Sequence, residues 1–576
     1  MLPPRSFVRV IVRIGTERSS ALRRPDVNVP LFIISFFTCS TRTRYRGTCT
    51  SDTEYRVLFV FITVTITIKK FVTWSAMSCM ALSLARLAQV VLASDTRPHL
   101  VFVLADDQGH NNFGGNNAEL ITPNTHALLN EGVTLTNQYV YKFCSPTRCS
   151  FLSGRLPIHV NQENSATEQP LAGVPLGMTT IAEVLKPAGY ATAHIGKWHC
   201  GQATTKHIPA GRGFDSSLSF FNFGEDHYTQ VRGGNAVDAG DAVDDAVLSR
   251  TPQLDLGFAA SRGADRATAP PGCAGVDLWR DHSPAYGMNG TYGGYTFVDE
   301  ATRVIETHAA KNSAKKTQQP LFMFIAFQNN HPPLQVPKQY IERYSTKALQ
   351  ITINGMTTFL DESVGNVTRA LKSAGMWERT LLVYSADNGG YLHQGGDDAP
   401  LRGGKFSDFQ GGTRVVSFAS GGYLPASVRG TTQSGLIHIA DWYATFASLA
   451  GVSAAALVDA RAAAAGLPAL DSINVWALVS GSNVTSPRTE VPLSAATAQR
   501  HNIGSGSGSG SPSYFVAGEG LIVGTWKLIV GPMHIGPFGP KPLNKCGAMI
   551  AAGKVGLINV LTSLTKIYLL TYSFLT

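Results

Sequence analysis

One short run, FCSPTRCSFLSGR (residues 143–155), places a thiol and a guanidinium at a spacing that suits anion chemistry. Pro146 fits the first turn of a helix, where its missing N–H has no cost. Cys144 and Arg148 are four residues apart and therefore lie on one face of that helix. A helix N-terminus offers free N–H donors and partial positive charge, so we expect this face to bind an anion. A bare Cys-x-Pro-x-Arg would better fit an ordinary helix start with a disulfide cysteine, but the full run with its Leu-Ser-Gly tail favours a functional site.

Four apolar runs that are typical of buried strands each end in polar residues. They are Leu100–Ala105, followed by Asp106 and Asp107; Tyr190–Ile195, followed by Lys197 and His199; Leu321–Phe327, followed by His331; and Leu381–Ala386, followed by Asp387 and Asn388. Helical segments separate these runs, which predicts an α/β fold with a large, mostly parallel sheet between helices. Because ligands bind at the carboxyl ends of such strands, we expect the four polar clusters to converge.

The converging oxygens suit a hard cation. Asp106, Asp107, Asp387 and the amide oxygen of Asn388 form an anionic, all-oxygen donor set, which favours Ca²⁺ over Zn²⁺. Either pair in isolation would be explained better by a turn. Found together at predicted strand ends, they indicate a metal site.

Complementary positive charge comes from Lys197, His199, His331 and Lys405, the last in the Gly-rich segment LRGGK (residues 401–405). An oxyanion ester needs donors for its nonbridging oxygens, a base for the attacking hydroxyl and an acid for the leaving oxygen. These four side chains can supply all three.

Taken together, these segments resemble the sulfatase family of the alkaline-phosphatase-like superfamily. The motifs that carry the resemblance are LADDQG, CSPTRCSFLSGR, GYATAHIGKWHCG, NNHPPLQVP, SADNGG and APLRGGKFSDFQGGTR, which occur in the family's order and spacing. The resemblance covers roughly residues 97–530 and looks closest to the arylsulfatase B (N-acetylgalactosamine-4-sulfatase) branch.

The resemblance implies a sulfuric ester hydrolase of the arylsulfatase type that acts on sulfated carbohydrate or aryl sulfate. It implies that a formylglycine-generating enzyme oxidises Cys144 to formylglycine, whose hydrated aldehyde attacks sulfur. The implied Ca²⁺ ligands are Asp106, Asp107, Asp387, Asn388 and the modified Cys144. Arg148 would stabilise the hydrate, His199 would assist its proton loss, and His331, Lys197 and Lys405 would bind sulfate and help the leaving group.

The chain also departs from the family pattern. Cys200 stands where leucine is usual after Gly-Lys-Trp-His, and Pro332 stands where the branch often has glutamate. The cysteines that are usual in residues 161–174 are missing. The last two differences border the site and bear on substrate identity more than on chemistry. Specificity is expected to lie in the loops of residues 221–295.

Charge is distributed unevenly along the chain. The formal net charge is +9, and residues 1–94 carry all of it, with 13 basic and 4 acidic side chains. The remaining residues are neutral overall, so the composition does not support nucleic-acid binding.

Cysteines and glycosylation sequons favour passage through the secretory pathway to a secreted or lysosome-like location. Five cysteines follow residue 94, namely Cys144, Cys149, Cys200, Cys273 and Cys546. Conversion of Cys144 would leave an even number, although the sequence does not fix their pairing. Sequons at Asn289, Asn366 and Asn483 agree with a glycoprotein.

We expect five segments in the chain. Residues 1–76 are expected to be non-structural or a gene-model extension, 77–94 a signal peptide, 96–481 the catalytic α/β domain, 482–546 a partial C-terminal α+β domain with an antiparallel sheet and a Gly/Ser linker, and 547–576 an atypical tail. No stable membrane span is expected, because the apolar run Val57–Ile68 is too short and Lys554 and Lys566 interrupt the tail.

Two other functions remain open at the level of sequence. The same aldehyde and anion cradle would suit a phosphate or phosphonate monoester hydrolase of the superfamily. A non-catalytic relative is the second alternative, because the expected C-terminal segments are eroded.

Overall fold

The computed structural model describes residues 95–165, 169–231, 276–345, 348–495 and 519–530, together with the backbone of four further strands. Contacts divide the chain into two compact units, residues 1–94 and 95–576. In the first unit, β1 (Ile11–Gly15) and β2 (Leu31–Ser35) pair antiparallel. The expected signal peptide and the Gly/Ser linker lie outside the described residues, and the expected domain boundaries remain predictions.

A ten-stranded mixed sheet with the order β13-β4-β12-β11-β3-β10-β6-β7-β8-β9 forms the centre of the second unit. Its parallel middle consists of β11 (Thr380–Ala386), β3 (His99–Ala105), β10 (Leu321–Ala326), β6 (Ala191–Lys197) and β7 (Ser216–Phe220). The outer strands are β13 (Thr431–Gln433), β4 (Val133–Leu135), β12 (Ser417–Ser420), β8 (Leu278–Arg280) and β9 (Ser283–Pro284). The pairs β12–β11 and β8–β7 are antiparallel. The predicted mostly parallel sheet is confirmed.

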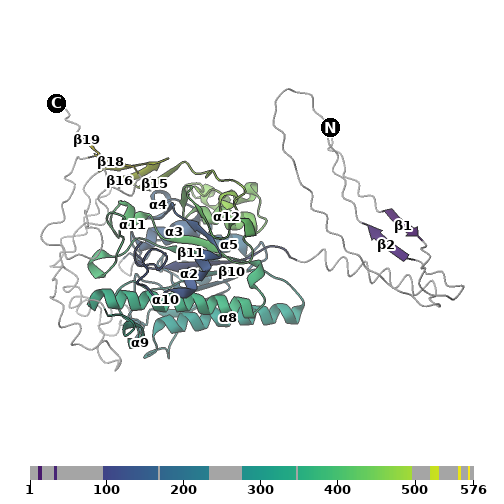
Figure 1. Ribbon diagram of the computed structural model, residues 1–576, viewed down its shortest axis with the longest axis horizontal. Helices are drawn as coiled ribbons and strands as arrows, with labels where there is room; N and C mark the ends of the chain where they lie inside the picture. Colours follow the sequence, from purple (N-terminus) through teal and green to yellow (C-terminus); the bar gives the residue numbers. More distant parts are fainter. Residues whose placement is uncertain are drawn as a thin grey trace. The chain divides into compact units, whose positions relative to one another are not determined.

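Helices lie on both faces of this sheet (Figure 1). On one face are α2 (Pro123–Asn130), α8 (Gly293–Lys315) and α10 (Ala348–Ser373). On the other face are α3 (Cys144–Ser153), α5 (Ile181–Leu185) and α12 (Asp441–Leu449). Every residue of β3, β10 and β11 is buried, which explains why these strands read as continuous apolar runs rather than alternating ones.

The remaining elements of the second unit are short. The helices are α4 (Pro157–Val160), α9 (Lys338–Ile341), α11 (Gln410–Thr413), α13 (Ala460–Ala464) and α14 (Trp476–Val479). The 3₁₀ turns are η1 (Pro209–Arg212), η2 (Trp377–Arg379), η3 (Leu392–Gln394), η4 (Ala426–Val428) and η5 (Ala454–Leu457). A separate parallel pair joins β5 (Gln138–Tyr139) to β14 (Ile437–His438). In the described residues no helix combines the length and the apolarity needed to cross a bilayer.

An aromatic cluster fixes α3 and α12 against the sheet. The ring of Phe102 on β3 lies 4.1 Å from that of Phe151 on α3 and 6.2 Å from that of Trp442 on α12, measured between centroids. Phe324 on β10 completes the layer, 4.8 Å from Phe151. Such pairs contribute about 0.5–1.5 kcal/mol each beyond their buried area, so the position of α3 is set by packing as well as by its own sequence.

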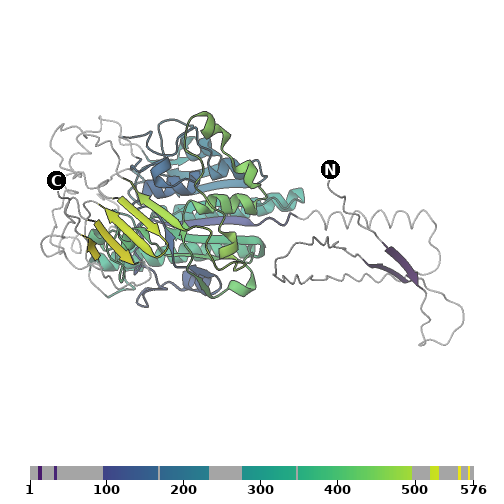
Figure 2. The same ribbon diagram turned by 90° about the horizontal axis from the view of Figure 1, so that it is seen from above.

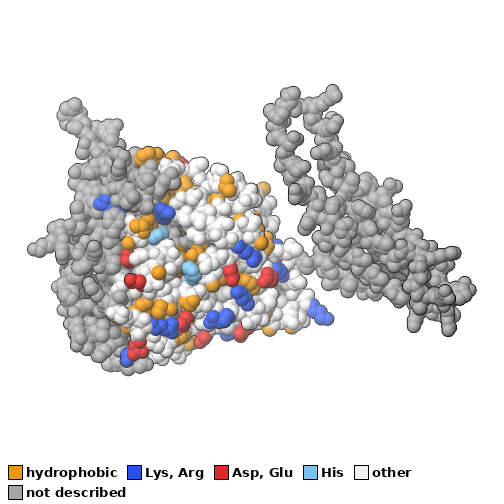
Figure 3. Space-filling model, viewed as in Figure 1, with side chains coloured by type: hydrophobic (Ala, Val, Ile, Leu, Met, Phe, Trp, Pro, Cys, Tyr) orange, Lys and Arg blue, Asp and Glu red, His pale blue; other side chains and the backbone are white. Residues whose placement is uncertain are grey.

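Basic and acidic side chains are interspersed on the face seen in Figure 3, along the two long helices. Glu300 of α8, for example, pairs with both Arg280 and Arg303. Arg343 pairs with Glu362 of α10. Neither sign of charge forms a continuous patch on this face.

A second, five-stranded antiparallel sheet follows the large mixed sheet in sequence (Figure 2). Its strands are β15 (Glu490–Ser494), β16 (Glu519–Val523), β17 (Trp526–Val530), β18 (Val555–Asn559) and β19 (Tyr568–Leu570). Val491, Leu493 and Ile522 form a small core with Tyr139 and Leu436. The antiparallel C-terminal sheet expected from the sequence is therefore present, and its last two strands continue into residues 547–576.

Two buried polar contacts join this sheet to the segment that follows Lys405. Lys527 of β17 is fully buried and donates to Thr413 Oγ1 over 2.7 Å. Ser494 of β15 donates to Asp408 Oδ1 over 3.0 Å, and Lys142 donates to the other oxygen of Asp408 over 2.7 Å. The second sheet is thus attached to the loop that also carries a predicted site residue.

Burial lowers the pKa of Lys527 from 10.5 to about 7; Asp408 opposes this effect, and Arg414 and Lys142 add to it. The unfolded chain therefore binds more protons than the native protein between about pH 7 and pH 10. As the pH falls through that range, Lys527 lowers the free energy of unfolding by an increasing amount. We expect Lys527→Met to raise Tm at pH 7 and to flatten the rise of Tm between pH 7 and pH 10. Differential scanning calorimetry across that range checks it, and an unchanged slope would contradict the assignment.

Candidate metal and anion site

The carboxyl ends of four neighbouring parallel strands bring the predicted polar residues to one place. In the register of the sheet, Ala386 at the end of β11 pairs with Ala105 at the end of β3. Ala326 at the end of β10 pairs with Leu104 and with Gly196 on β6. Hydrogen bonds or ion pairs join nine of the ten predicted site residues: Asp106, Asp107, Cys144, Arg148, Lys197, His331, Asp387, Asn388 and Lys405. His199, the tenth, is buried among them with neither ring nitrogen hydrogen-bonded.

Helix α3 presents Cys144 at its first residue, as predicted, with Arg148 one turn later. Its N-cap, Phe143, is extended and provides no side-chain acceptor, so no side chain competes for the first N–H groups. Gly154 ends the helix in the left-handed conformation at φ 66°, and a Cβ there would lie 2.7 Å from the ring of Tyr443. The glycine of the Leu-Ser-Gly tail is therefore a helix stop in a crowded position.

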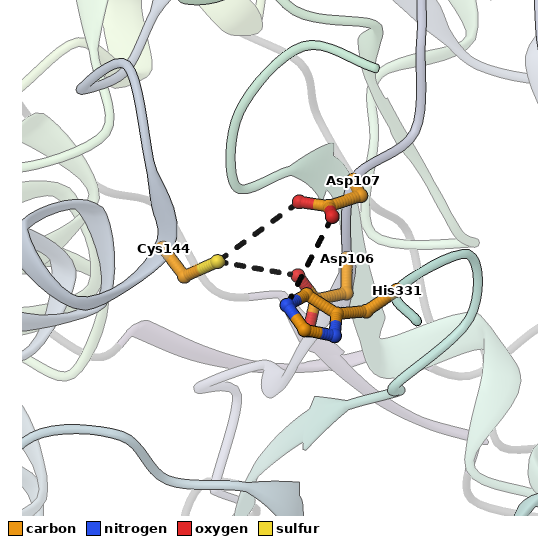
Figure 4. Close-up of side chains that lie close together, drawn as sticks. All are labelled: Asp106, Asp107, Cys144 and His331. Atoms are coloured by element: carbon orange, nitrogen blue, oxygen red, sulfur yellow. Dashed lines mark hydrogen bonds and ion pairs between the residues drawn. The ribbon is translucent and has the colours of Figure 1, made fainter. Parts of the chain in front are cut away.

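Basic side chains from two different elements contact Asp106. Lys197 Nζ, at the end of β6, lies 2.6 Å from Asp106 Oδ2, and Arg148 Nη2 lies 3.4 Å from the same oxygen. Cys144 Sγ lies 3.5 Å from Asp106 Oδ1. Helix α3 and strand β6 are thus connected through one buried carboxylate. Figure 4 shows Cys144 beside Asp106 and Asp107.

Asp107 is held by a separate set of groups. Lys405 Nζ and Asn388 Nδ2 each donate to it over 2.7 Å, and His331 Nε2 lies 3.9 Å away. Burial raises the pKa of Asp107, but the positive charges of Lys405, His331 and Lys197 outweigh burial and lower it to about 2. The residue is therefore an anion, and its backbone is left-handed at φ 50°, a conformation that is uncommon outside glycine and frequent at functional sites.

Asp387 has the opposite electrostatic environment. Arg148 donates to Asp387 Oδ2 through Nε over 3.0 Å and through Nη2 over 2.7 Å. Burial and the neighbouring charge of Asp106 nevertheless raise the pKa of Asp387 to about 6. At Asp387, burial and the charge of Asp106 therefore outweigh the positive charge of Arg148.

The donor set fits a divalent cation. One ligand atom each from Asp106, Asp107, Cys144 and His331 lies within 4.8 Å of all the others. Asn388 Oδ1 is buried next to this group without a hydrogen-bond partner, as expected for an oxygen that can bind a cation. The tightest group includes His331, which the sequence assigned to sulfate binding, whereas Asp387 and Asn388 border it. His331 Nδ1 lies 2.6 Å from the Pro332 carbonyl, which leaves Nε2, 3.9 Å from Asp107, as the ring nitrogen that faces the cluster.

Both histidines are neutral in this environment. Burial, followed by the charges of Lys197 and other nearby cations, lowers the pKa of His199 well below its usual range. Burial, Lys197 and Lys405 do the same to the pKa of His331, with Asp107 opposing them. A neutral imidazole can accept a proton, so each ring is suited to proton transfer.

Sequence reasoning missed the buried pair Lys142–Asp408, whose Nζ–Oδ2 distance is 2.7 Å. The Lys142 carbonyl also accepts from Phe406 N over 2.7 Å. These bonds connect the segment before α3 with the loop that carries Lys405. The partners are 266 residues apart, so no local signal could have found them.

Buried charge of both signs at the carboxyl edge of a mostly parallel sheet defines a class of α/β proteins that hold a cation and an anionic ligand together. Residues 98–452 match the sulfatase family model, which is more than half of the chain. The chain therefore belongs to the sulfatase family.

Curated relatives agree with this membership. Arylsulfatase J of Mus musculus is 32% identical over 407 residues, covering 69% of this chain and 58% of that protein. Arylsulfatase A of Homo sapiens is 26% identical over 368 residues, covering 62% and 65%. N-acetylgalactosamine-6-sulfatase of Mus musculus is 26% identical over 386 residues, covering 64% and 66%. The chain spans less than two thirds of the length of each.

Solved structures share the fold at low sequence identity. The PsFucS1 sulfatase from Pseudoalteromonas sp. aligns with a TM-score of 0.59 and 19% identity, covering 84% of this chain and 88% of that chain. Ps i-CgsB in complex with k-i-k-neocarrahexaose aligns with a TM-score of 0.58 and 22% identity, covering 82% and 88%.

The bond between Arg148 and Asp387 can be tested by a double-mutant cycle. Both side chains are fully buried, so Arg148→Met leaves carboxylates without their cation. We expect it to lower the free energy of unfolding by about 3–5 kcal/mol. Arg148→Met combined with Asp387→Asn should cost at least about 1 kcal/mol less than the sum of the two single changes. Urea unfolding monitored by circular dichroism measures all three variants.

The half-exposed pair Arg343–Glu362 is a matched control. The same cycle at that pair should give a coupling below about 1 kcal/mol, because solvent screens it. Additive effects at Arg148 and Asp387 would show that the two side chains do not interact.

Proposed function

We propose that this chain hydrolyses sulfate esters and that Cys144 is the precursor of its nucleophile. The observation that carries the proposal is the position of Cys144, at the first residue of a buried helix, 3.5 Å from Asp106 and beside Arg148, Lys197 and Lys405. Membership of the sulfatase family supports it.

The charge balance favours an anionic substrate. Within the cluster, the three carboxylates of Asp106, Asp107 and Asp387 are matched by the cations Arg148, Lys197 and Lys405. A divalent cation would give the cluster a net charge of about +2, which a bound sulfate group would neutralise. Water is excluded from most of these groups, so each interaction with an anion is stronger than it would be at the surface.

We propose Ca²⁺ as the metal, held by Asp106, Asp107, Asp387, Asn388 and the modified Cys144. The donors are mostly oxygens, which suits a hard cation, whereas zinc would favour histidine or thiolate. When bound, the ion would supply Lewis-acid polarisation of the oxygens in the site.

Each remaining side chain has a proposed task. When Cys144 is converted, formylglycine supplies a hydroxyl nucleophile in place of the thiol. Arg148, fixed by Asp387 and by the Lys197 carbonyl, orients the modified side chain. His199 accepts a proton, since neither of its ring nitrogens is engaged. Lys197, Lys405 and His331 bind the sulfate group and help the leaving group.

We propose a sulfated carbohydrate or an aryl sulfate as the substrate, and the formylglycine-generating enzyme as a partner. Support comes from relatives named arylsulfatase and N-acetylgalactosamine-6-sulfatase.

We also propose passage through the secretory pathway to a secreted or lysosome-like location. The sequon asparagines Asn289 and Asn483 are exposed, which suits glycosylation. Asn366 lies within α10 and is only half-exposed, which suits it less. Cys273 and Cys546 lie outside the described residues.

Mass spectrometry and one substitution test the nucleophile. In protein expressed with the formylglycine-generating enzyme, we expect the tryptic peptide of residues 143–148 to be about 18 Da lighter than its cysteine form, because a thiol becomes an aldehyde. Cys144→Ala should lower hydrolysis of an aryl sulfate by at least about 10³-fold with little change in Tm.

Unmodified cysteine, seen while a control sulfatase is converted in the same cells, would contradict the proposal. Faster turnover of an aryl phosphate than of the matching aryl sulfate would instead assign the site to phosphate esters.

Chelation tests the metal. We expect removal of the cation to lower Tm and added Ca²⁺ to restore it, by about 2.7 kcal/mol of stability when Ca²⁺ is at a hundred times its Kd. Asp107→Asn should remove most of this response. Differential scanning fluorimetry, with metal content checked by atomic emission, measures it against Mg²⁺.

Asp361→Asn is the matched control, because Asp361 is an equally buried carboxylate that accepts from Asn124 and Thr125 at the start of α2, outside the cluster. It should lower Tm yet keep the full response to Ca²⁺. An equal loss of response in both variants would contradict the assignment of Asp107 as a ligand.

A further inference from the structure

Two further cysteines directly follow proposed site residues in the chain. Cys149 comes after Arg148 on α3, and Cys200 comes after His199 in the loop beyond β6. Both are buried, at 0% and 1% exposure, and both belong to the main hydrophobic core. Neither has a place in the proposed hydrolysis.

Hydrogen bonds show that the two segments face each other. Ser145 lies one turn before Cys149 on the same face of α3, with Oγ 3.9 Å from Cys149 Sγ. Ser165 N donates to Ser145 Oγ over 3.2 Å, and Gly201 N, the residue after Cys200, donates to Ser165 Oγ over 3.0 Å. One serine therefore bridges the cysteine face of α3 and the cysteine loop.

Both cysteines are free thiols in the structure, and they lie close enough for one to affect the other. Burial, followed by a hydrogen bond that it shares with the Cys149 thiol, raises the pKa of the Cys200 thiol well above its usual range. Asn161 Nδ2 also donates to Cys149 Sγ over 3.9 Å. Two cysteines whose sulfurs are already neighbours need only small side-chain rotations to reach bonding distance, whereas distant ones need backbone movement.

We propose that Cys149 and Cys200 form a disulfide bond that links α3 to the loop after β6. The reaction is thiol–disulfide exchange with a carrier protein that holds an oxidised disulfide. The two thiols lose two protons and two electrons and form one S–S bond, and the carrier's disulfide is reduced to two thiols. The proposal depends on the secretory passage proposed above only for access to this oxidant.

The bond must form before the core is complete. In the folded protein both thiols are buried, and the raised pKa of Cys200 leaves little of the thiolate that exchange requires. The same burial then shields the finished bond from reductants. The cross-link closes a loop of about fifty residues, long enough to restrict the unfolded chain substantially.

One tryptic digest tests this bond and the proposed function separately. The full-length protein, expressed in a secretory host, is alkylated with iodoacetamide in denaturant without reductant. Cleavage places Cys149 in residues 149–155, Cys200 in residues 198–206 and Cys144 in a third peptide, residues 143–148. We expect the first two peptides to appear as one linked species, about 2 Da lighter than their reduced sum. Recovery of both as separately alkylated peptides, or linkage of either to Cys273 or Cys546, would overturn the proposal.

The state of the peptide with Cys144 reports independently on formylglycine, so a missing disulfide and a missing nucleophile give different spectra. Thermal stability is the second readout. Cys149→Ser and Cys200→Ser should each lower Tm by several degrees, and the double variant should lose little more than either one, because one bond is lost in each case. Dithiothreitol should lower the Tm of the wild type only after exposure under denaturing conditions. Additive losses in the double variant would contradict a shared bond.

Discussion

Three carboxylates and three cations are buried together at one edge of a sheet, and this burial is the main constraint on the protein. Removing an ion from water costs several kcal/mol even after relaxation, so each must meet a partner. The partners come from different elements: Arg148 on α3 meets Asp387 after β11, Lys197 at the end of β6 meets Asp106 after β3, and Lys405 in a late loop meets Asp107. The strand order and the position of α3 bring these pairs together.

The same constraint gives chemically identical side chains different properties. Asp107 faces Lys405 and keeps a low pKa, whereas Asp387 lies beside another carboxylate and has a raised one. The two histidines are kept neutral by burial among lysines. A site with an anion, a carboxylate near its titration point and two neutral imidazoles can bind a charged group and move protons within a few ångströms.

The convergence of the strand ends was predictable because it depends on local patterns. Strands that are buried on both faces read as continuous apolar runs, and one rule about parallel sheets places their ends together. The pairing of Cys144 with Arg148 follows from helical spacing alone. Helix α8 was not predicted, since it begins with two glycines and its buried face mixes apolar residues with polar ones such as Glu300 and His308.

What could not be predicted depends on contacts between distant parts of the chain. Lys142 resembles any loop lysine until Asp408 is seen beside it, and the contact between Cys149 and Cys200 exists only in three dimensions. Which side chains face a cation and which face an anion also depends on geometry. The sequence assigned His331 to sulfate binding, whereas the structure places it within 4.8 Å of ligand atoms of Asp106, Asp107 and Cys144.

The contacts of Asp408 have a thermodynamic consequence. Its two oxygens accept hydrogen bonds from Lys142, in the segment before α3, and from Ser494, in the second sheet. The loop that presents Lys405 is therefore stabilised from both sides. Binding of a ligand to Lys405 and attachment of the second sheet are therefore coupled through this loop. Linkage is reciprocal, so the free energy by which attachment strengthens ligand binding equals the free energy by which the ligand strengthens attachment.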